Sequence, residues 1–462
     1  MVNKWPVFCE GILVLCVLLI ATPVWPFTGV LVNGNAINLV SDNTDNTITY
    51  ARSIGGPGAE YFVRMLPTNE GVVMAGTTIK SVSDTTDLLL SKISPDGIIT
   101  SAMLYGGTHK DVMNNIIKTS DGGFLLLGET QSLFFTLLKF MNPSTPIGRP
   151  IVIKVKPDLS LEWAQLFPES YNYFFQDAVE LENEYFITGY DPKVRGIIVS
   201  MDKSGKLKAG KVISEGYVLY SSKSDNNSFM TVGVTKIDSS NALTVIKVSN
   251  NGEDRTIKCF ASKDIRYNPT RVLSTQDKGC IVNGSITEID DKKNEITKAF
   301  VAKFNSNVEI EWIRSYATSK KTTALSVIEY ASGYIIDGYA TGFRGDIPTG
   351  LHILVDNKGN GVKYKIYGST TNTVTIDKSY LDSSNNLTSV GLVAKEAAPA
   401  DFLLLKNNIA NMIVFDKSLI TVNEIQTIET KVPINSIEAI TKISAVSITN
   451  DISVKKVSFK NE

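Results

Sequence analysis

Histidine and cysteine are scarce in this sequence, and their scarcity excludes much of metal and acid–base chemistry. Only two histidines, His109 and His352, occur in 462 residues, so sites built from several histidines have little to draw on. No CxxC pair is present, which sets zinc ribbons and thioredoxin-like redox centres aside. We therefore expect neither a metal ion nor a cofactor.

A surplus of basic residues is also missing. Lys and Arg number 46 against 47 Asp and Glu, which gives a formal net charge of −1. Binding along a nucleic-acid backbone depends on a cationic surface, so we expect no nucleic acid as a partner. The remaining composition, with 43% hydrophobic and 20% charged residues, is that of an ordinary globular protein.

The N-terminal segment 1–27 differs from the rest of the chain. Lys4 precedes an apolar run, residues 11–21, that ends before Pro23. Such a run matches the hydrophobic region of a signal peptide and is short for a membrane span. The alternative is an uncleaved N-terminal anchor attached to the membrane, because Glu10 lies beside the run and no small-x-small cleavage site follows it. In both cases we expect an exported protein, periplasmic, at the cell surface or secreted, with residues 28–47 as a linker.

Two of the four cysteines, Cys9 and Cys16, belong to that N-terminal segment, and Cys259 and Cys280 lie in the body of the chain. Cysteine commonly behaves as a small buried hydrophobe, so we expect two free thiols on different strands. A single disulfide in an oxidising compartment is the alternative.

A short apolar segment that ends in glycine recurs along the chain. Its seven copies end at Gly76, Gly128, Gly189, Gly233, Gly284, Gly338 and Gly391. The spacing between consecutive copies is nearly regular, at roughly 50 residues, and a period of this length is typical of repeat architectures. In such architectures each unit packs against its neighbours.

Each period contains the parts of four short strands. A polar turn precedes the glycine-terminated strand, as in 119–123 (TSDGG), and an apolar strand that often ends in lysine follows it, as in 151–154 (IVIK). A second turn and a strand with an aromatic residue such as Trp163 complete the unit. Asp, Asn and Gly provide the backbone angles that tight hairpins need. Four antiparallel strands per period describe a β-propeller blade, and we attribute the glycine to a β-bulge or a close backbone approach.

Seven such units predict an all-β, seven-bladed propeller of four-stranded blades over residues 48–417. The segment 48–56 resembles a last strand without a blade of its own. We expect it to join the final blade, whose own last strand, 411–415, is weakly marked, and so to close the ring. Residues 418–462 alternate like strands but lack the glycine signature. We expect a separate β-rich tail there, with an eighth blade as the alternative.

The segment Thr119–Thr130, TSDGGFLLLGET, is similar to the T-x-D-G-G-[FY]-x-x-x-G-x-T blade motif of secreted bacterial and archaeal β-propeller repeat proteins. Trp163 and the YGG of 105–107 match the W-x-x-x-Y-G-G ending of that family in part. The resemblance covers all seven units, although the third, fourth and seventh lack the Asp-Gly-Gly turn. It implies a propeller scaffold located in the cell envelope or outside the cell, and it implies no particular reaction.

Propellers commonly bind ligands on the face that carries the loops between blades and between their second and third strands, and function has to be argued from that site. The loop 132–146 of the second unit holds several large apolar residues, among them Phe134, Phe135 and Phe140. If they are exposed, they would form a docking patch for a partner, a glycan or a membrane surface. If the loop folds onto the propeller, they form part of a local hydrophobic core.

Other loops on that face carry charged or titratable candidates. An acidic run in the fifth unit contains Asp290 and Asp291, which either bind a ligand or form a solvated hairpin, since the EF-hand pattern is absent. Arg344 and Asp346 belong to an Arg-Gly-Asp tripeptide, which is an adhesion signal or an ordinary turn. His109 is a candidate base. No G-x-S-x-G elbow accompanies it, so a loop histidine without a catalytic role is the simpler interpretation.

Two functions fit these features, and we prefer the first because no complete catalytic arrangement is visible. It is an exported, non-catalytic propeller that binds or scaffolds a protein or a carbohydrate at the cell envelope. The second is a secreted propeller enzyme acting on glycans, with carboxylates such as Asp290 or Asp346 as acid and base. That mechanism needs two acids about 5–10 Å apart in one pocket. A spacer in a surface layer is a third interpretation.

Overall fold

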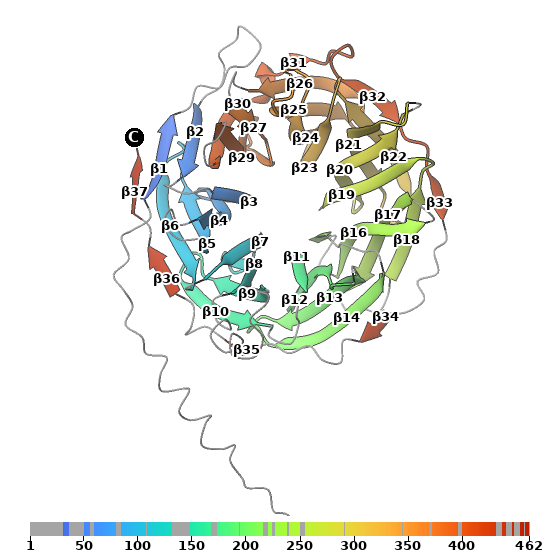
Figure 1. Ribbon diagram of the computed structural model, residues 1–462. Coiled ribbons are helices and arrows are strands. Elements are labelled where there is room, and N and C mark those ends of the chain that lie inside the picture. Colours follow the sequence, from blue (N-terminus) through green and yellow to red (C-terminus); the bar gives the residue numbers. More distant parts are fainter. Residues whose placement is uncertain are drawn as a thin grey trace, which may run out of the picture.

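The computed structural model describes residues 31–36, 50–55, 60–79, 85–107, 109–131, 148–167, 173–193, 195–215, 220–223, 227–237, 240–249, 255–290, 292–343, 345–368, 372–395, 400–430, 437–439, 446–447, 453–456 and 458–461. These residues form strands and one short 3-10 helix, η1 (Ile409–Asn411). The strands make seven sheets arranged in a ring (Figure 1). The prediction of an all-β, seven-bladed propeller is confirmed, and the eight-blade alternative is wrong.

In six blades four consecutive strands pair antiparallel, the innermost strand first and the fourth farthest out (Figure 1). The strands of blades 1 to 3 are β3 (Glu60–Thr68), β4 (Gly71–Ile79), β5 (Thr86–Ile93), β6 (Ile99–Gly106), β7 (Asp111–Lys118), β8 (Phe124–Thr130), β9 (Arg149–Val155), β10 (Leu161–Leu166), β11 (Phe174–Glu180), β12 (Glu184–Tyr190), β13 (Arg195–Asp202) and β14 (Leu207–Glu215). Those of blades 4 to 6 are β15 (Tyr220–Lys223), β16 (Ser228–Ile237), β17 (Ser240–Ser249), β18 (Arg255–Ala261), β19 (Ile265–Ser274), β20 (Cys280–Ile289), β21 (Glu295–Phe304), β22 (Ile310–Ala317), β23 (Thr322–Tyr330), β24 (Gly333–Ala340), β25 (Thr349–Asp356) and β26 (Gly361–Tyr367).

The seventh blade closes the ring by combining strands from both ends of the propeller segment. Its later strands are β27 (Asn372–Val374), β28 (Lys378–Leu381), β29 (Asn386–Lys395) and β30 (Ala400–Asn408). β2 (Tyr50–Gly55) pairs antiparallel with β30, which confirms that the segment 48–56 joins the final blade. β1 (Leu31–Ala36) pairs with β2 in the same sheet. Part of the segment 28–47, expected to be a linker, is therefore a blade strand.

The C-terminal strands surround the ring as a belt instead of forming the separate tail that we expected. The belt consists of β31 (Ile413–Val414), β32 (Thr421–Glu424), β33 (Ile428–Thr430), β34 (Ile437–Ala439), β35 (Val446–Ser447), β36 (Ser453–Lys456) and β37 (Ser458–Asn461). The first six add a fifth, antiparallel strand to blades 6, 5, 4, 3, 2 and 1 in turn. β37 then pairs parallel with β1 of blade 7. The belt thus runs once around the propeller against the order of the blades (Figure 1).

The belt also corrects the assignment of residues 411–415 to the edge of the final blade, because β31 pairs with β26 of blade 6. The outermost strand of each blade presents unpaired backbone N–H and C=O groups, and a short added strand satisfies them. A pattern of alternating apolar residues predicts a strand without saying which of these edges it joins.

The recurring glycine makes room for a β-bulge in the innermost strand. A Cβ on Gly284 would lie 2.2 Å from the carbonyl oxygen of Asn268 in β19. β19 carries an extra residue here, because its pairing with β20 shifts register between Pro269 and Arg271. Corresponding shifts and contacts occur at the recurring glycines of blades 1, 2, 3 and 6. The prediction that the glycine marks a β-bulge or a close backbone approach is confirmed in these five blades, where both occur, and a bulge re-aims the side chain that follows it.

Apolar side chains fill the spaces between neighbouring blades. Val301 of blade 5 and Ile336 of blade 6 belong to one buried cluster, and Leu127 of blade 2 and Ile187 of blade 3 belong to another. Packing of this kind buries both faces of each sheet, which a single blade cannot do. The segment between β31 and β33 adds Ile420 and Ile425, both buried in such clusters.

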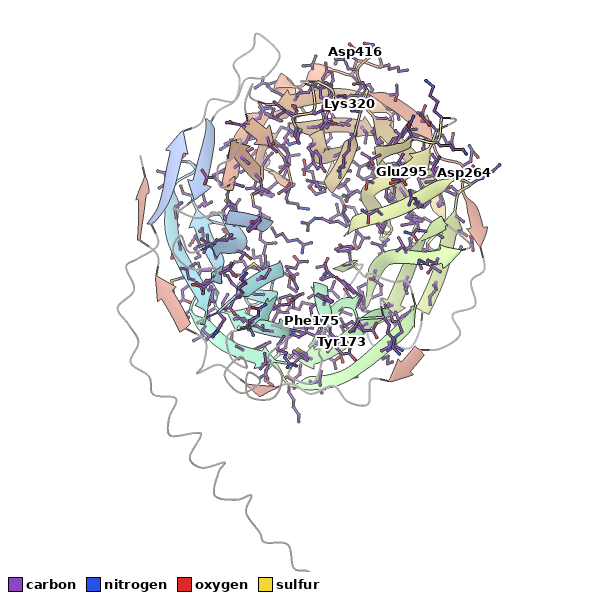
Figure 2. The ribbon with its side chains drawn as sticks, in the orientation of Figure 1. Tyr173, Phe175, Asp264, Glu295, Lys320 and Asp416 are labelled. Carbon is purple, nitrogen blue, oxygen red and sulfur yellow. The ribbon has the colours of Figure 1, made fainter. Side chains whose placement is uncertain are left out.

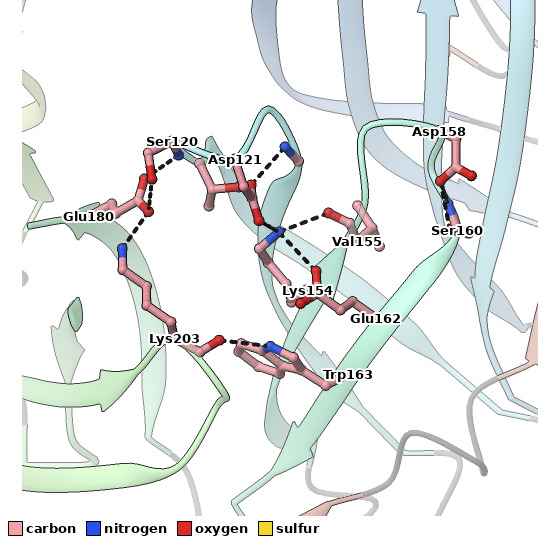
Figure 3. A network of polar contacts seen from close by, with 12 residues as sticks. Ser120, Asp121, Lys154, Val155, Asp158, Ser160, Glu162, Trp163, Glu180 and Lys203 are labelled. Atoms are coloured by element: carbon pink, nitrogen blue, oxygen red, sulfur yellow. Dashed lines mark hydrogen bonds and ion pairs between the residues drawn. The ribbon is translucent and has the colours of Figure 1, made fainter. Parts of the chain in front are cut away.

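The Asp-Gly-Gly turn of blade 2 is a brace built around a buried lysine (Figure 3). One carboxylate oxygen of Asp121 accepts a hydrogen bond from the Gly123 amide at 2.9 Å, and the other accepts from Lys154 Nζ at 2.7 Å. The Lys154 side chain is only 1% exposed. Blade 5 repeats the arrangement with Asp277 and Lys303 at 2.6 Å. The motif and the lysine-ended strand therefore hold the first hairpin of a blade to its third strand.

Aromatic residues of the fourth strands tie neighbouring blades together. Trp163 Nε1 donates to the Lys203 carbonyl oxygen at 3.2 Å, across the boundary between blades 2 and 3 (Figure 3). Trp312 makes the same contact with Asn357 at 2.7 Å between blades 5 and 6. The Lys203 ammonium also pairs with Glu180. The sequence features that carry the family resemblance thus position the turns and the blades.

Candidate functional site

Seven residues, one from each blade, occupy the same position beside the recurring glycine. Each pairs with the residue that precedes the glycine in the second strand of its blade, and we call them the inner ring: Arg64, Asn115, Asp177, Tyr220, Arg271, Ser326 and Lys378. Five of them line two cavities along the innermost strands: Arg64, Asn115, Tyr220, Arg271 and Lys378. The repeat of the fold therefore gathers side chains that are far apart in the sequence.

The two cavities form the candidate site, which we call the channel. The larger, about 710 Å³, is lined by the later halves of the innermost strands and reaches turn residues such as Ser120 and Leu381. It opens on the face where each innermost strand turns into the second strand, which we name the hairpin face. The smaller, about 350 Å³, includes Asn115 and Asp377 and lies toward the opposite, crossover face, where the chain enters each new blade. Arg271 lines both. The larger volume is within the range of small-molecule sites.

Polar contacts along the wall of the channel connect blades that are not neighbours. Arg64 Nη1 of blade 1 lies 3.4 Å from Asp177 Oδ1 of blade 3 and donates to the Ile116 carbonyl oxygen of blade 2 at 3.3 Å. Asn115 Nδ2 of blade 2 donates to the same Asp177 oxygen at 2.8 Å. Asp177 is almost fully buried, and these contacts fix the charge of Arg64 at the wall of the channel.

Three cations of the inner ring influence one another. Burial, together with the positive charges of Arg271 and Arg64, lowers the pKa of Lys378 to about 7. Burial and then the charge of Arg64 lower the pKa of Arg271 to about 10. Asp177 and Asp337 act in the opposite direction on Lys378. Like charges held this close repel one another, so a bound anion would stabilise the group.

Two acids stand close to these cations, and burial raises the pKa of each to about 6. Asp337 in β24 accepts hydrogen bonds from Ser326 Oγ at 2.5 Å and Ser379 Oγ at 2.8 Å. Asp377 lines the smaller cavity, where the charge of Arg271 favours its ionised form. Both acids are mostly ionised at neutral pH and lose their charge below about pH 6.

His352 lies in a closed polar network between blades 6 and 7. Its Nε2 is 3.2 Å from Ser379 Oγ and 3.4 Å from Asp337 Oδ1, and its Nδ1 is 3.0 Å from the Tyr367 hydroxyl. Burial lowers the pKa of His352 to about 3. A Ser-His-Asp triad places the histidine between serine and acid, whereas Ser379 donates directly to Asp337 and both face one nitrogen. The network is therefore an internal contact between blades and does not form a triad.

The predicted candidates that the structure describes lie on the crossover face and remain apart from the channel. His109 precedes β7, Asp290 follows β20 and Asp346 precedes β25, and none of them lines either channel cavity. Asp290 accepts from the backbone amides of Lys292 at 2.9 Å and Asn294 at 2.7 Å. It therefore closes its own hairpin turn.

Asp346 pairs with Lys320 at 2.5 Å, and both side chains are exposed. Figure 2 shows Lys320 over blade 6 and Glu295, at the end of the acidic hairpin, over blade 5, away from the centre of the ring. Gly342 and Phe343, close to Asp346 in sequence, line a cavity of about 490 Å³ beside the belt. Phe134, Phe135, Phe140, Asp291 and Arg344 lie outside the described residues.

The inner ring was missed because its residues share a position and not a residue type. Each precedes its recurring glycine by nearly the same offset in the sequence, as Arg64 precedes Gly76 and Lys378 precedes Gly391. Reading that offset in every unit would have shown two arginines and a lysine among seven positions. This pattern was the signal available in the sequence.

Three further expectations concern metal, membrane and thiols. Among the described residues, no group of three or more His, Cys, Asp or Glu side chains is suited to a metal ion. The part of the chain that the structure describes has no helix long and apolar enough to span a membrane, and the N-terminal segment 1–27 is outside it. Cys259 in β18 and Cys280 in β20 are buried thiols that form no disulfide, which confirms that prediction.

No family model matches the chain, and no curated protein matches its sequence. Among solved structures, the chain is similar to the polysaccharide lyase Uly1, at 9% identity and a TM-score of 0.45, covering 84% of this chain and 98% of the other. A protein of unknown function from Dyadobacter fermentans DSM 18053 shows 10% identity and a TM-score of 0.39, covering 67% and 97%. Drosophila Plexin A in complex with Semaphorin 1b shows 8% identity and a TM-score of 0.30, covering 82% and 88%.

Proposed function

We propose that this protein is an exported, non-catalytic binding module at the cell envelope, and that a carbohydrate enters the larger cavity of the channel from the hairpin face. The single observation that supports this site most strongly is the convergence of inner-ring side chains on a cavity of about 710 Å³. The N-terminal run of residues 11–21 and the blade motif support export.

The cavity favours a carbohydrate over a folded protein partner. Its volume suits a few sugar rings and excludes a globular domain. Its wall is polar where charged side chains and Ser379 line it. Leu66, Pro67 and Tyr380 provide apolar surface. Sugars present hydroxyl groups at their edges and apolar ring faces, so they can use both kinds of wall. Tyr380 is 37% exposed and offers an aromatic surface at the mouth.

A panel of neutral and acidic oligosaccharides, titrated calorimetrically into the full chain, tests this function. Tyr380→Ala at the channel mouth should weaken binding at least tenfold. Tyr61→Ala is the matched control, because Tyr61 is an exposed tyrosine on the crossover side of β3. Loss of binding in Tyr61→Ala, or in His109→Ala and Asp346→Asn, would place the ligand on the crossover face. Absence of binding to any oligosaccharide would refute the carbohydrate assignment and leave a protein segment as the ligand class.

An enzyme acting on glycans remains the second function to test, because Glu180 and Glu329 both line the larger cavity. Glu180 accepts hydrogen bonds from the backbone N–H and the hydroxyl of Ser120 at 2.6 and 2.8 Å and pairs with Lys203. Glu329 accepts from the backbone N–H of Gln276 at 3.1 Å. Carboxylates held in this way are suited to fixing the position of the turns at the mouth of the channel. Chromatography of the same oligosaccharides after prolonged incubation decides the matter, since intact chains are expected and shortened chains would establish an enzyme.

A further inference from the structure

We infer that the larger cavity recognises an acidic group, a carboxylate or a sulfate, on the carbohydrate that enters it, and that Arg64, Arg271 and Lys378 bind this group. The inference rests on the proposed function, whose site it specifies. The three cations come from blades 1, 5 and 7 and line one cavity. They are close enough for the charges of Arg271 and Arg64 to act on Lys378.

The side chains that line the larger cavity include four cationic residues and two carboxylates. Lys118 joins the three cations in the lining, against the carboxylates of Glu180 and Glu329. Two groups outside this lining offset charges of opposite sign, since Lys203 pairs with Glu180 and Asp177 pairs with Arg64. A cleft with walls of low dielectric concentrates such a field and raises the local concentration of anions.

The geometry of Arg64 leaves donors for a ligand. Both of its contacts with the protein, to Ile116 and Asp177, use Nη1, whereas a guanidinium group carries five N–H donors. Charge-assisted hydrogen bonds from guanidinium and ammonium groups to carboxylate or sulfate oxygens are about twice as strong as neutral ones. Two oxygens of a carboxylate or of a sulfate can accept hydrogen bonds from these donors.

Binding should depend on pH through the groups that face Lys378. Those groups are Arg64 on β3, Arg271 on β19, Asp177 on β11, Asp337 on β24 and the adjacent Asp377. As the pH rises from 6 to 8, the two acids with raised pKa complete their ionisation and Lys378 loses its proton. Both changes make the cavity less positive, so affinity for an anion falls.

The experiment measures dissociation constants of the full chain for tri-galacturonic acid, galactose 6-sulfate and neutral galactotriose at constant ionic strength. We expect the two acidic probes to bind at least tenfold more tightly than galactotriose. The preferred probe identifies the acidic group. Lys378→Met should raise the dissociation constant for it at least tenfold. Lys417→Met, at an exposed lysine of the β31–β32 connection, should change nothing. Lys378→Arg should keep the affinity and flatten its decline above pH 7.

The outcomes separate this inference from the function on which it rests. Equal binding of acidic and neutral probes, or unchanged affinity in Lys378→Met while Tyr380→Ala loses it, overturns the inference and leaves the binding function standing. Binding of galactose 6-sulfate without binding of any oligosaccharide supports the anion site and refutes a chain ligand. No binding of any probe overturns both. If Lys378→Met fails to fold, the pH dependence of the affinity of the wild-type chain tests the inference instead. Affinity that falls with rising pH supports the inference, and affinity that rises with pH contradicts it.

Discussion

Arg64 of blade 1 and Asp177 of blade 3 lie 3.4 Å apart, Nη1 to Oδ1, on the inner side of blade 2. The two blades are not neighbours, and blade 2 contributes Asn115 to the same carboxylate oxygen. The bulges beside Gly76 and Gly189 bring both residues to the inner ring. The inner ring is thus a shared structural element of several blades as well as the wall of the channel.

Removal of the Asp177 charge should destabilise the propeller. Asp177→Asn keeps the shape of the side chain but leaves the largely buried Arg64 without its ion pair. A loss of about 2 kcal/mol in the free energy of unfolding is expected, as for a buried hydrogen-bonded charge. Denaturant unfolding measures it. Asp264→Asn is the control, since Asp264 is exposed and Asn tolerates its positive φ of 58°. Equal losses of stability in the two variants would contradict a stabilising ion pair between Asp177 and Arg64.

Gly284 should resist substitution by alanine because its Cβ would collide with the Asn268 carbonyl oxygen at 2.2 Å. Gly284→Ala should therefore lower the free energy of unfolding by about 3 kcal/mol, at the upper end of overpacking costs. Gly345→Ala is the control, because its φ of +71° carries backbone strain while nothing lies within 4 Å, and about 1 kcal/mol is expected there. Thermal or denaturant unfolding distinguishes them. A cost no greater than that of the control would mean that the bulge needs no glycine.

The Asp121–Lys154 brace should contribute to stability in a pH-dependent way. The Lys154 bonds outweigh partial burial and lower the pKa of Asp121 to about 2, so the carboxylate stabilises the fold above about pH 4 and this contribution is lost as the pH falls toward 2. Lys154→Met should lower the free energy of unfolding by about 1–2 kcal/mol near pH 7, a modest cost because Asp121 is half exposed to solvent. It should also flatten the dependence of stability on pH in the acid range. Lys156→Met, at an exposed neighbour, should behave as wild type.

His352 should add a second acid-sensitive contribution. Burial lowers its pKa to about 3, so its neutral form stabilises the fold above about pH 6.5 and the contribution is lost as the pH falls to 3. Asp337, with a pKa raised to about 6, acts oppositely, since its contribution is present below about pH 4 and is lost as the pH rises through 6. The difference in unfolding free energy between wild type and His352→Gln isolates the histidine. It should shrink by up to about 1.4 kcal/mol per pH unit on acidification, and a constant difference would contradict a neutral buried His352.

Removal of six of the seven belt strands, β32–β37, should weaken the ring without opening it. A chain ending at Lys417 loses β32–β37 and the buried Ile420 and Ile425, while the β2–β30 pairing that closes the ring remains. Its melting temperature should fall, and the bared outer edges should promote association that grows with concentration. Circular dichroism and sedimentation measure both effects. Complete unfolding would show that the belt is required for closure.

The repeating glycine was sufficient to predict the number of blades and the close backbone approach at the bulges. The closing strand was predicted from the likeness of the segment 48–56 to the last strand of a blade. The belt could not be assigned, because pairing partners such as Cys259 in β18 and Thr430 in β33 lie far apart in the sequence and strand alternation does not specify an edge. The channel was missed for a related reason. Attention to loops with unusual composition led to His109, Asp290 and Asp346, whereas Arg271 and Lys378 sit in ordinary strands.

Hydrogen–deuterium exchange of the full chain with and without tri-galacturonic acid tests the central claim most directly, because it locates the ligand without a substitution. Slower exchange is expected around 64–67, 271–273 and 378–381, where the innermost strands line the channel. Protection confined to the crossover face, around His109, Asp290 and Asp346, would contradict the account.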